Sequence, residues 1–196
     1  EYSGEQLSHL YWTQHLGDDY IGNLVVFFRG PMNVKPEFIC DNTERINRGN
    51  PAFKIVGPDL IHIIADFPQI GGGENGLFKM YALQNILIRM IADKFRQISK
   101  LKIRCDETDI YADGKKLNVA ISTCTTKSSL FHVGINLKTG TSNKKYRIPK
   151  QIPAAALLEL VDLNEDFFID AMRRTVLNWI ELVDKITAKV YKTYTH

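Results

Sequence analysis

Apolar residues recur at helical spacing in four parts of the chain, and this spacing predicts four helices. The clearest period runs through residues 77–97, where an apolar residue returns every three or four positions. Weaker patterns predict helices over residues 2–16 and 154–161. The last predicted helix follows Asn164, because asparagine is a favoured capping residue at helix N-termini, and its apolar face extends to Ile186.

Unbroken apolar runs predict two buried strands in the first half of the chain. The first runs from Leu24 to Phe28, and Gly30-Pro31 is expected to end it. The second covers Leu60 to Phe67 and precedes a glycine-rich turn over residues 69–76. Residues 31–53 contain three prolines and a polar run, which predicts a long loop of the kind that is usually functional or mobile.

Three further strands are predicted at hairpin spacing, over residues 103–111, 116–122 and 129–137. The Asp113-Gly114 pair between the first two is a turn signal. Strands flanked in sequence by helices predict an α+β fold, in which a mixed or antiparallel sheet packs against helices. The length suits one domain that spans residues 1–196.

The composition indicates the cellular compartment of the protein but says little about its function. Three cysteines without metal-binding spacing predict a reducing compartment, and we expect a cytoplasmic protein. No stretch is apolar enough to span a bilayer, so no membrane partner is expected. The net charge of +3 is too balanced to indicate nucleic acid by itself. Glu1 is not a natural start, which leaves open an N-terminal extension.

Two segments in the second half resemble the catalytic domains of biotin and lipoate protein ligases. Residues 108–117 place Asp109 on a strand, follow it with a turn and contain the basic pair Lys115-Lys116. Residues 131–137 form a later strand that contains Gly134-Ile135-Asn136. Biotin protein ligases carry a similar pair of segments, and lipoate ligases share the aspartate, the lysine and the hairpin between them.

The chain as a whole resembles an uncharacterised family, domain of unknown function 366. The cues are Tyr2-Ser3-Gly4, Phe28-Arg29-Gly30-Pro31, Pro58-Asp59-Leu60 and residues 132–137. Residues 152–160 also resemble the helix that follows the catalytic sheet in biotin ligases. The family has a biotin/lipoate-ligase-like fold without an assigned reaction, so this resemblance implies the fold and leaves the function open.

The ligase resemblance implies a reaction that brings two anions together. A ligase of this class activates a small carboxylic acid with ATP and Mg²⁺ as an acyl-adenylate, and then passes the acyl group to an amine, usually on an acceptor protein. A fixed cation between the carboxylate and the α-phosphate offsets their repulsion and stabilises the transition state. Lys116 matches the catalytic lysine by position. The alternative is that Lys115 and Lys116 are hairpin-end lysines on an exposed edge.

Residues near this lysine are candidates for nucleotide or acyl binding. Asp109 would face the nucleotide, through Mg²⁺ or through polar groups, or it caps the strand end. Asn136 would hold a backbone or nucleotide group, or it is a turn former after a strand. Gly134 belongs to the same strand, as does His132, for which a structural role is the default interpretation.

Basic segments that contain glycine are candidates for a loop over the adenylate. Arg48-Gly49 is the first, and Arg29-Gly30, at the end of the first predicted strand, is the second. Arginine suits phosphate through its planar set of donors, and glycine lets the backbone approach closely. The alternative for Arg48 is an ordinary solvated loop. No protein-only metal site is predicted, because no cysteine or histidine spacing indicates one.

Departures from the ligase pattern leave other functions open. The Gly-Arg-Gly-Arg-Arg-Gly loop of the ligases is absent, and residues 105–108 replace their Lys-Trp-Pro-Asn. A non-catalytic module that binds a small molecule or nucleotide with the same sheet is therefore the alternative function. RNA association through residues 144–147 is less favoured, because this short basic cluster is interpreted first as a solvated loop. Cys124 is favoured as an ordinary sheet residue over a thioester carrier, and exposed strand edges leave a homodimer open.

Overall fold

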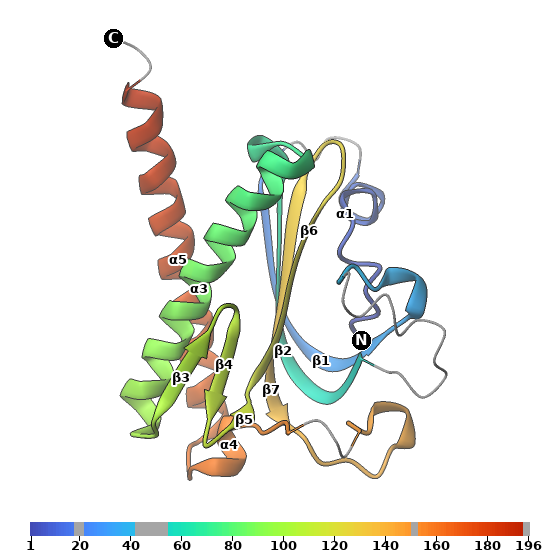
Figure 1. The fold of residues 1–196 in the computed structure, drawn as a ribbon, viewed down its shortest axis with the longest axis vertical. Coiled ribbons are helices and arrows are strands. Elements are labelled where there is room, and N and C mark those ends of the chain that lie inside the picture. The colour runs from blue at the N-terminus through green and yellow to red at the C-terminus, as the bar shows by residue number, and fades with distance from the viewer. Residues whose placement is uncertain (18–21, 42–54, 150–152, 194–196) are drawn as a thin grey trace.

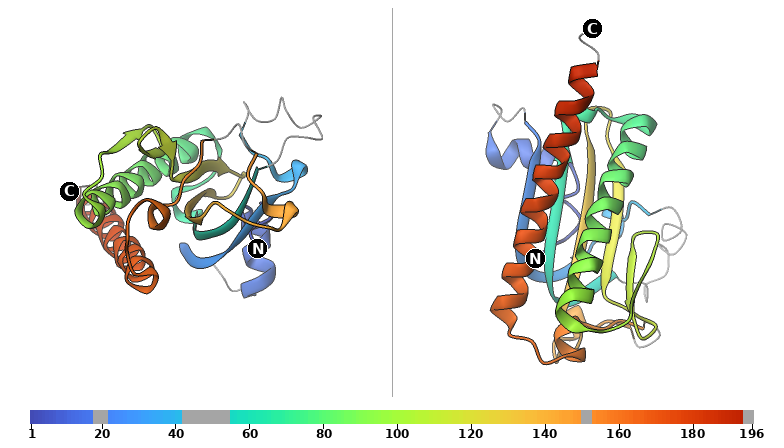
Figure 2. Two further views of the ribbon diagram at one scale, coloured as in Figure 1. Left: turned by 90° about the horizontal axis from the view of Figure 1, so that it is seen from below. Right: turned by 90° about the vertical axis from the view of Figure 1, so that its left-hand side faces the viewer.

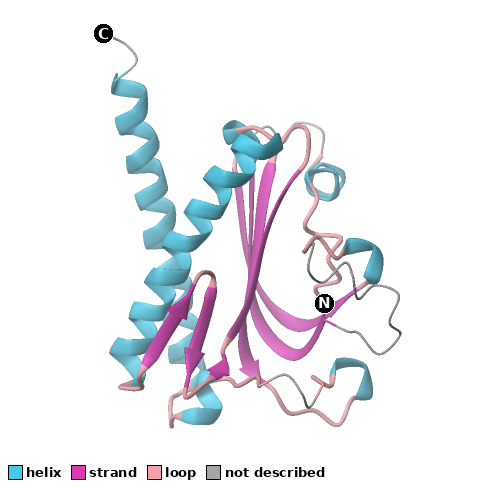
Figure 3. Cartoon of the chain, viewed as in Figure 1, coloured by secondary structure: helices cyan, strands magenta, loops and turns pink. Residues whose placement is uncertain are grey.

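The computed structural model describes residues 1–17, 22–41, 55–149 and 153–193, with side chains up to residue 186 in the last helix. Within these ranges, seven strands form two antiparallel sheets (Figures 1 and 3). The strands are β1 (Leu24–Val34), β2 (Ile55–Phe67), β3 (Ile103–Asp106), β4 (Asp109–Ala112), β5 (Lys115–Lys116), β6 (Asn118–Cys124) and β7 (Ser129–Lys138). The larger sheet has the order β1-β2-β7-β6 and the smaller one the order β3-β4-β5. The predicted α+β architecture with an antiparallel sheet is confirmed.

Helices cover the large sheet unequally. Two long helices, α3 (Gly73–Ser99) and α5 (Glu165–Thr193), pack side by side on one face, whereas α1 (His9–Leu16) lies over the other (Figures 1 and 2). Shorter elements are the helix α4 (Leu157–Leu160) and the 3₁₀ turns η1 (Pro36–Phe38), η3 (Pro68–Ile70) and η4 (Lys144–Tyr146). Within the described part of the chain, no helix combines the length and the apolar character that crossing a bilayer requires.

Both faces of the central strands are buried, because each faces a different core. Successive side chains of a strand point to opposite faces, so β2 sends Ile61 and Ile63 toward the two long helices and Leu60 and Ile64 toward the N-terminal segment. On the helix side, Trp179 of α5 packs against aromatic rings of the sheet and donates its indole N–H to a carbonyl of α3. This two-sided burial explains why the central strands appear in the sequence as unbroken apolar runs.

The predicted helix over residues 2–16 is wrong in its first half. Helix α1 begins only at His9, and Tyr2 instead forms an isolated parallel bridge with Met32 of β1. The Tyr2 N–H donates to the Pro31 carbonyl at 2.9 Å, and the Asn33 N–H donates to the Tyr2 carbonyl at 2.9 Å. The Tyr2 ring is also buried in a core cluster that contains Met32. The hydrogen bonds and this burial together outweigh a weak helical pattern.

The first strand also departs from its prediction. Gly30-Pro31 does not end β1, which continues to Val34 after a shift of register between Gly30 and Met32. The shift accommodates a proline, which cannot donate to a neighbouring strand. The predicted loop over 31–53 therefore starts later, and its residues 42–53 lie outside the described residues.

Two of the predicted hairpin strands are each divided. A turn with Glu107 at φ 50° separates β3 from β4, and Leu117 separates β5 from β6. The predicted turn at Asp113-Gly114 is confirmed, since these residues have φ values of 50° and 75° between β4 and β5. Positive φ at both central positions is the geometry for which Asp-Gly is favoured. The consequence of the division is that the chain passes from the small sheet into the large one within three residues.

The buried side chain of Asn118 fixes this passage. Its Oδ1 accepts a hydrogen bond from the Ile110 N–H at 2.7 Å, and its Nδ2 donates to the Thr108 carbonyl at 2.9 Å. Replacing Asn118 by alanine would leave both backbone groups without these partners, so we expect a loss of about 1–3 kcal/mol in the free energy of unfolding. Urea denaturation measures this loss. Replacing Asn178, an exposed asparagine on α5, is the matched control and should change the free energy little.

Candidate ligand-binding site

A cavity of about 340 Å³ lies on the second face of the large sheet, between strand β6, the N-terminal segment and the chain around η1. This volume falls within the range of about 300–1,000 Å³ that is typical of small-molecule sites. The apolar wall includes Leu7, Met32, Phe38, Val119, Ile121 and Ile148. Polar residues that line the cavity include Tyr2, Lys116, His132 and Asn136. The cavity is thus mainly apolar, with a few polar groups among its walls.

Lys116 is the only lysine or arginine among the described residues that line the cavity. Its strand β5 pairs with β4 on one side, where Lys116 lies opposite Tyr111. On the other side, the Lys116 N–H donates to the Pro153 carbonyl at 2.7 Å, and the Lys116 carbonyl accepts from the Ala155 N–H at 3.0 Å. The backbone is held from both sides, which fixes the point from which the ammonium group reaches the cavity.

The ammonium group of Lys116 is paired with Asp109, with Nζ 2.7 Å from Oδ1. The other carboxylate oxygen of Asp109 accepts a hydrogen bond from the Tyr111 hydroxyl at 3.1 Å. Burial, and then the neighbouring Asp109 charge, raises the pKa of Tyr111, so its hydroxyl remains a donor. The structure therefore brings together the two residues that the sequence indicated as the centre of the site.

Asn136 holds backbone groups at the end of the same sheet. Its Nδ2 donates to the Ala155 carbonyl at 3.0 Å and lies 3.4 Å from the Lys116 carbonyl oxygen. The backbone N–H of Asn136 donates to the Leu117 carbonyl. Of the roles considered for Asn136, the structure shows the contact with backbone, which ties β7 to the segment that positions Lys116.

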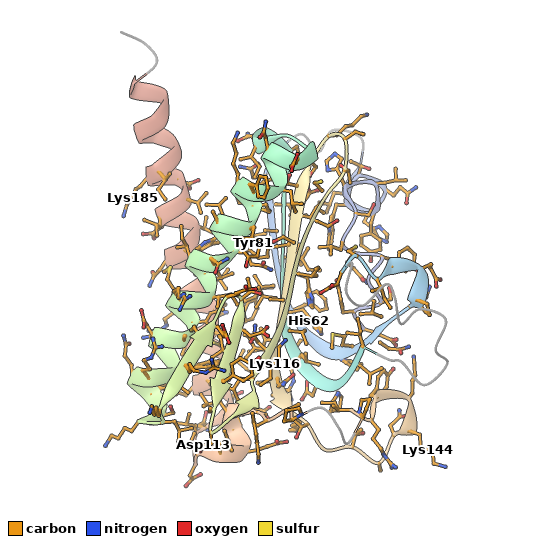
Figure 4. All side chains as sticks on the ribbon, in the orientation of Figure 1. His62, Tyr81, Asp113, Lys116, Lys144 and Lys185 are labelled. Atoms are coloured by element: carbon orange, nitrogen blue, oxygen red, sulfur yellow. The ribbon has the colours of Figure 1, made fainter. Side chains whose placement is uncertain are left out.

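His132 lies on the cavity side of β7 and forms a buried pair with His62 of β2. His62 Nδ1 and His132 Nε2 are 2.9 Å apart, and His62 Nε2 is 3.0 Å from the carbonyl oxygen of Gly30. The Tyr2 ring stacks on His132 with ring centroids 3.8 Å apart. Burial lowers the pKa of His62 to about 4 and that of His132 well below its ordinary value. Both rings are therefore neutral near pH 7. Figure 4 labels His62, which belongs to the large sheet, and Lys116, which lies where the small sheet meets the large one.

Gly134 makes room for this arrangement. It lies on the same face of β7 as His132, two residues further along the strand. A Cβ atom at Gly134 would lie 2.8 Å from Val119 Cγ2 and 3.2 Å from His132 Cε1. A side chain there would overlap Val119 and crowd the imidazole of His132, so glycine is required for space and not for its backbone conformation.

Of the two arginine-glycine candidates, the one at Arg29-Gly30 is not brought to the cavity. The Arg29 guanidinium hydrogen-bonds Asp59 at 2.6 and 2.9 Å and Glu165 at 2.6 Å, and it does not line the cavity. Its carboxylate partners engage the donors that a phosphate would need. Gly30 contributes its carbonyl to His62. Arg48 and Gly49 lie outside the described residues.

Two other sequence candidates lie apart from the cavity. Cys124 ends β6 and is not among the residues that line the cavity. In the basic cluster, Lys145 Nζ is 2.9 Å from a carboxylate oxygen of Glu1, which also accepts from the Tyr146 hydroxyl. This cluster holds the N-terminal segment in place, and Figure 4 shows Lys144 well away from Lys116.

Sequence reasoning missed Tyr2 and His62. Tyr2 served only as a cue to the family and was placed in a helix, although it lines the cavity. His62 was passed over within an apolar strand. The sequence does contain a signal for this pair: each of two mainly apolar strands contains one histidine. Two such histidines indicate a buried hydrogen-bonded pair when their strands are neighbours. The register that makes them neighbours, His62 near His132 across β2 and β7, is not encoded locally.

Two proteins that are similar to this chain are described as uncharacterised or of unknown function. It is 26% identical to "Uncharacterized protein MJ0805" of Methanocaldococcus jannaschii, over 98% of this chain and 80% of that protein. A protein of unknown function from Pyrococcus horikoshi has a TM-score of 0.76 at 24% identity, over 95% of this chain and 89% of that one. A structure described as "protein Ta0514, putative lipoate protein ligase from T. acidophilum" has a TM-score of 0.55 at 14% identity, over 92% and 82%.

These likenesses agree with the biotin/lipoate-ligase-like fold that the residues around Asp109 and Lys116 predicted. A family model matches almost the whole chain, and not only the segments that resemble ligases. It covers residues 1–194, and the chain therefore belongs to the family described as "Domain of unknown function (DUF366)".

Proposed function

We propose that the protein binds a small carboxylic acid in the cavity and activates it with ATP as an acyl-adenylate. The observation that carries this proposal is the position of Lys116, a rigidly mounted cation at the wall of a mainly apolar cavity. An apolar tail suits the aliphatic wall, and the acid's carboxylate suits the ammonium group. The fold shared with a protein described as a lipoate ligase is consistent with this assignment and does not by itself establish it.

The proposed adenylation depends on a positive charge near the reacting groups and not on general acid or base catalysis. A carboxylate oxygen attacks the α-phosphorus of ATP, the bond to the β-phosphate oxygen breaks, and pyrophosphate leaves. Lys116 would reduce the repulsion between the two anions as they approach and would stabilise the negative charge on the transferring phosphoryl group. Asp109 would hold the ammonium group toward the reacting atoms. An amine would then attack the acyl carbon, the bond between this carbon and the phosphate oxygen would break, and AMP and a proton would leave. The proposed amine is a lysine on an acceptor protein.

The described residues fit a magnesium ion that arrives with the nucleotide. They contain no group of three or more side chains able to hold a metal by themselves. Magnesium is commonly held by one or two carboxylates together with substrate phosphates, and Asp109 is the carboxylate beside Lys116. When bound, Mg²⁺ would neutralise phosphate charge.

Acid-dependent release of pyrophosphate tests the proposal. The protein is incubated with ATP and Mg²⁺ together with one acid at a time, from a panel that includes biotin, lipoate and octanoate. We expect release that requires both ATP and one class of acid, with reactions that lack the acid as the control. If the protein binds ATP or an acid but releases no pyrophosphate with any member of the panel, the ligase assignment is wrong and a non-catalytic binding module remains.

A further inference from the structure

The cavity contains hydrogen-bonding groups that the proposed chemistry at Lys116 does not use. Tyr2 and His132 both line it, and their residues are only 3% and 2% exposed. Their rings are stacked nearly parallel, with an angle of 14° between the ring planes. No group among the described residues forms a hydrogen bond with the Tyr2 hydroxyl. A buried hydroxyl without a partner costs about 1–3 kcal/mol, so its persistence beside a cavity points to a partner that the ligand supplies.

The hydrogen bonds of the two histidines determine where their protons lie. A carbonyl oxygen only accepts, so His62 Nε2, which faces the Gly30 carbonyl, is the protonated nitrogen of its ring. In a neutral ring Nδ1 is then an acceptor, and the His132 Nε2 that lies 2.9 Å from it must donate. A neutral His132 with its proton on Nε2 has a bare lone pair on Nδ1.

This lone pair has no donor among the described residues, in which the His132 ring forms one hydrogen bond, to His62. The ring is fixed on several sides. The Tyr2 ring covers one of its faces, and the absent side chain of Gly134 lets its Cε1 edge lie close to the sheet. The residues that line the cavity therefore include one with an acceptor that has no partner among the described residues, His132, and one whose hydroxyl both donates and accepts, Tyr2.

We propose that His132 and Tyr2 recognise a hydroxyl or amide group on the tail of the bound acid, so that the substrates are carboxylic acids with a polar tail group and not plain alkanoic acids. A ligand O–H or N–H donates to His132 Nδ1, and a ligand oxygen accepts from the Tyr2 hydroxyl. A methylene tail would bury both protein groups without a partner, and a site built to bond a hydroxyl rejects an analogue that lacks it. This inference rests on the proposed function only in placing the carboxylate at Lys116.

Direct binding of matched acids, measured by calorimetry without ATP, tests this inference. The probes are octanoate, each of its monohydroxylated isomers, and N-acylglycines of similar length. We expect at least one hydroxylated or amide-bearing acid to bind wild type about tenfold more tightly than octanoate. The preference should shrink to roughly twofold or less in Tyr2→Phe, which removes one oxygen, and in His132→Phe, which keeps an aromatic ring without nitrogen.

His132→Gln is the conservative variant, because its amide nitrogen can donate to His62 while its oxygen remains an acceptor for the ligand. It should retain most of the preference, whereas a merely structural role for His132 would give the Gln and Phe variants the same behaviour. Thermal unfolding checks that each variant is folded. If His132→Phe does not fold, Tyr2→Phe decides, because it removes a hydroxyl that has no partner among the described residues.

Three results would overturn the inference: octanoate binding as tightly as every polar acid, a preference that survives in Tyr2→Phe and His132→Phe alike, or no binding of any acid. Pyrophosphate release, measured in parallel, separates the two proposals. Preferential binding without release keeps the recognition by His132 and Tyr2 and removes the adenylate chemistry. Release without preference does the reverse.

Discussion

Replacing Lys116 by alanine is expected to lower acid-dependent pyrophosphate release roughly 100- to 1,000-fold. This is the range seen when one electrostatic stabiliser of a transition state is removed from an enzyme. The ammonium group is the only one from a lysine or arginine among the described residues that line the cavity, so no neighbour there replaces it. The rate should fall more than the affinity for the acid, because the charge that Lys116 offsets is greatest in the transition state.

The adjacent lysine is the matched control for this experiment. Lys115 has an exposed side chain, does not line the cavity and belongs to the same two-residue strand. Its replacement by alanine should leave release within about twofold of wild type, because an exposed charge contributes little to chemistry elsewhere. Equal losses in the two variants, or no loss in Lys116→Ala, would remove Lys116 from the mechanism.

Acidification is expected to destabilise the fold by about 3 kcal/mol through His62 alone. In the unfolded chain this histidine has a pKa of 6.5, and in the folded protein its pKa is about 4. Above pH 6.5 neither state binds the proton, so this contribution to stability is complete. As the pH falls from 6.5 toward about 4, only the unfolded state binds the proton, and the free energy of unfolding falls. A drop in pKa from 6.5 to about 4 corresponds to about 3 kcal/mol.

Urea denaturation between about pH 8 and about pH 4 measures this loss. Carboxylates also titrate in this interval, so the informative quantity is the difference between wild type and a variant with both His62 and His132 replaced by glutamine. Glutamine can donate and accept as the imidazoles do but does not titrate, so the variant should lose less stability over the interval. Curves that run parallel for the two proteins would show that the pair is not buried in its neutral form.

Where a short segment decides the structure, the sequence was sufficient to predict it. Asp113-Gly114 forms the expected turn because its backbone needs positive φ at both positions. Asn164 caps α5 as expected, since its Oδ1 accepts from the Phe167 N–H at 2.9 Å. Asp109 and Lys116 come together because one tight hairpin connects them. In each case the relevant interactions span fewer than about ten residues, a range over which turn and capping rules apply.

Where pairing over long distances decides the structure, the sequence was not sufficient. Tyr2 joins β1 across about thirty residues, and no local pattern distinguishes that bridge from a frayed helix. The pairing of His62 with His132 depends on the register between β2 and β7. A shift of one residue between these two strands would place the two imidazoles on opposite faces of the sheet. The polar wall of the cavity is therefore visible only in three dimensions, whereas its cation was visible in the sequence.

The two-sided support of Lys116 has a consequence for amide hydrogen exchange. The amide hydrogens of Lys116, Leu117 and Ala155 are donated to carbonyls of three different segments. All three hydrogen bonds involve Lys116 or its neighbour Leu117, so opening any one of them weakens the other two. We expect the three amides to exchange slowly and at one common rate, as members of a single cooperative unit. The charge of Lys116 would then be carried by a part of the molecule that opens only when the junction between the two sheets opens.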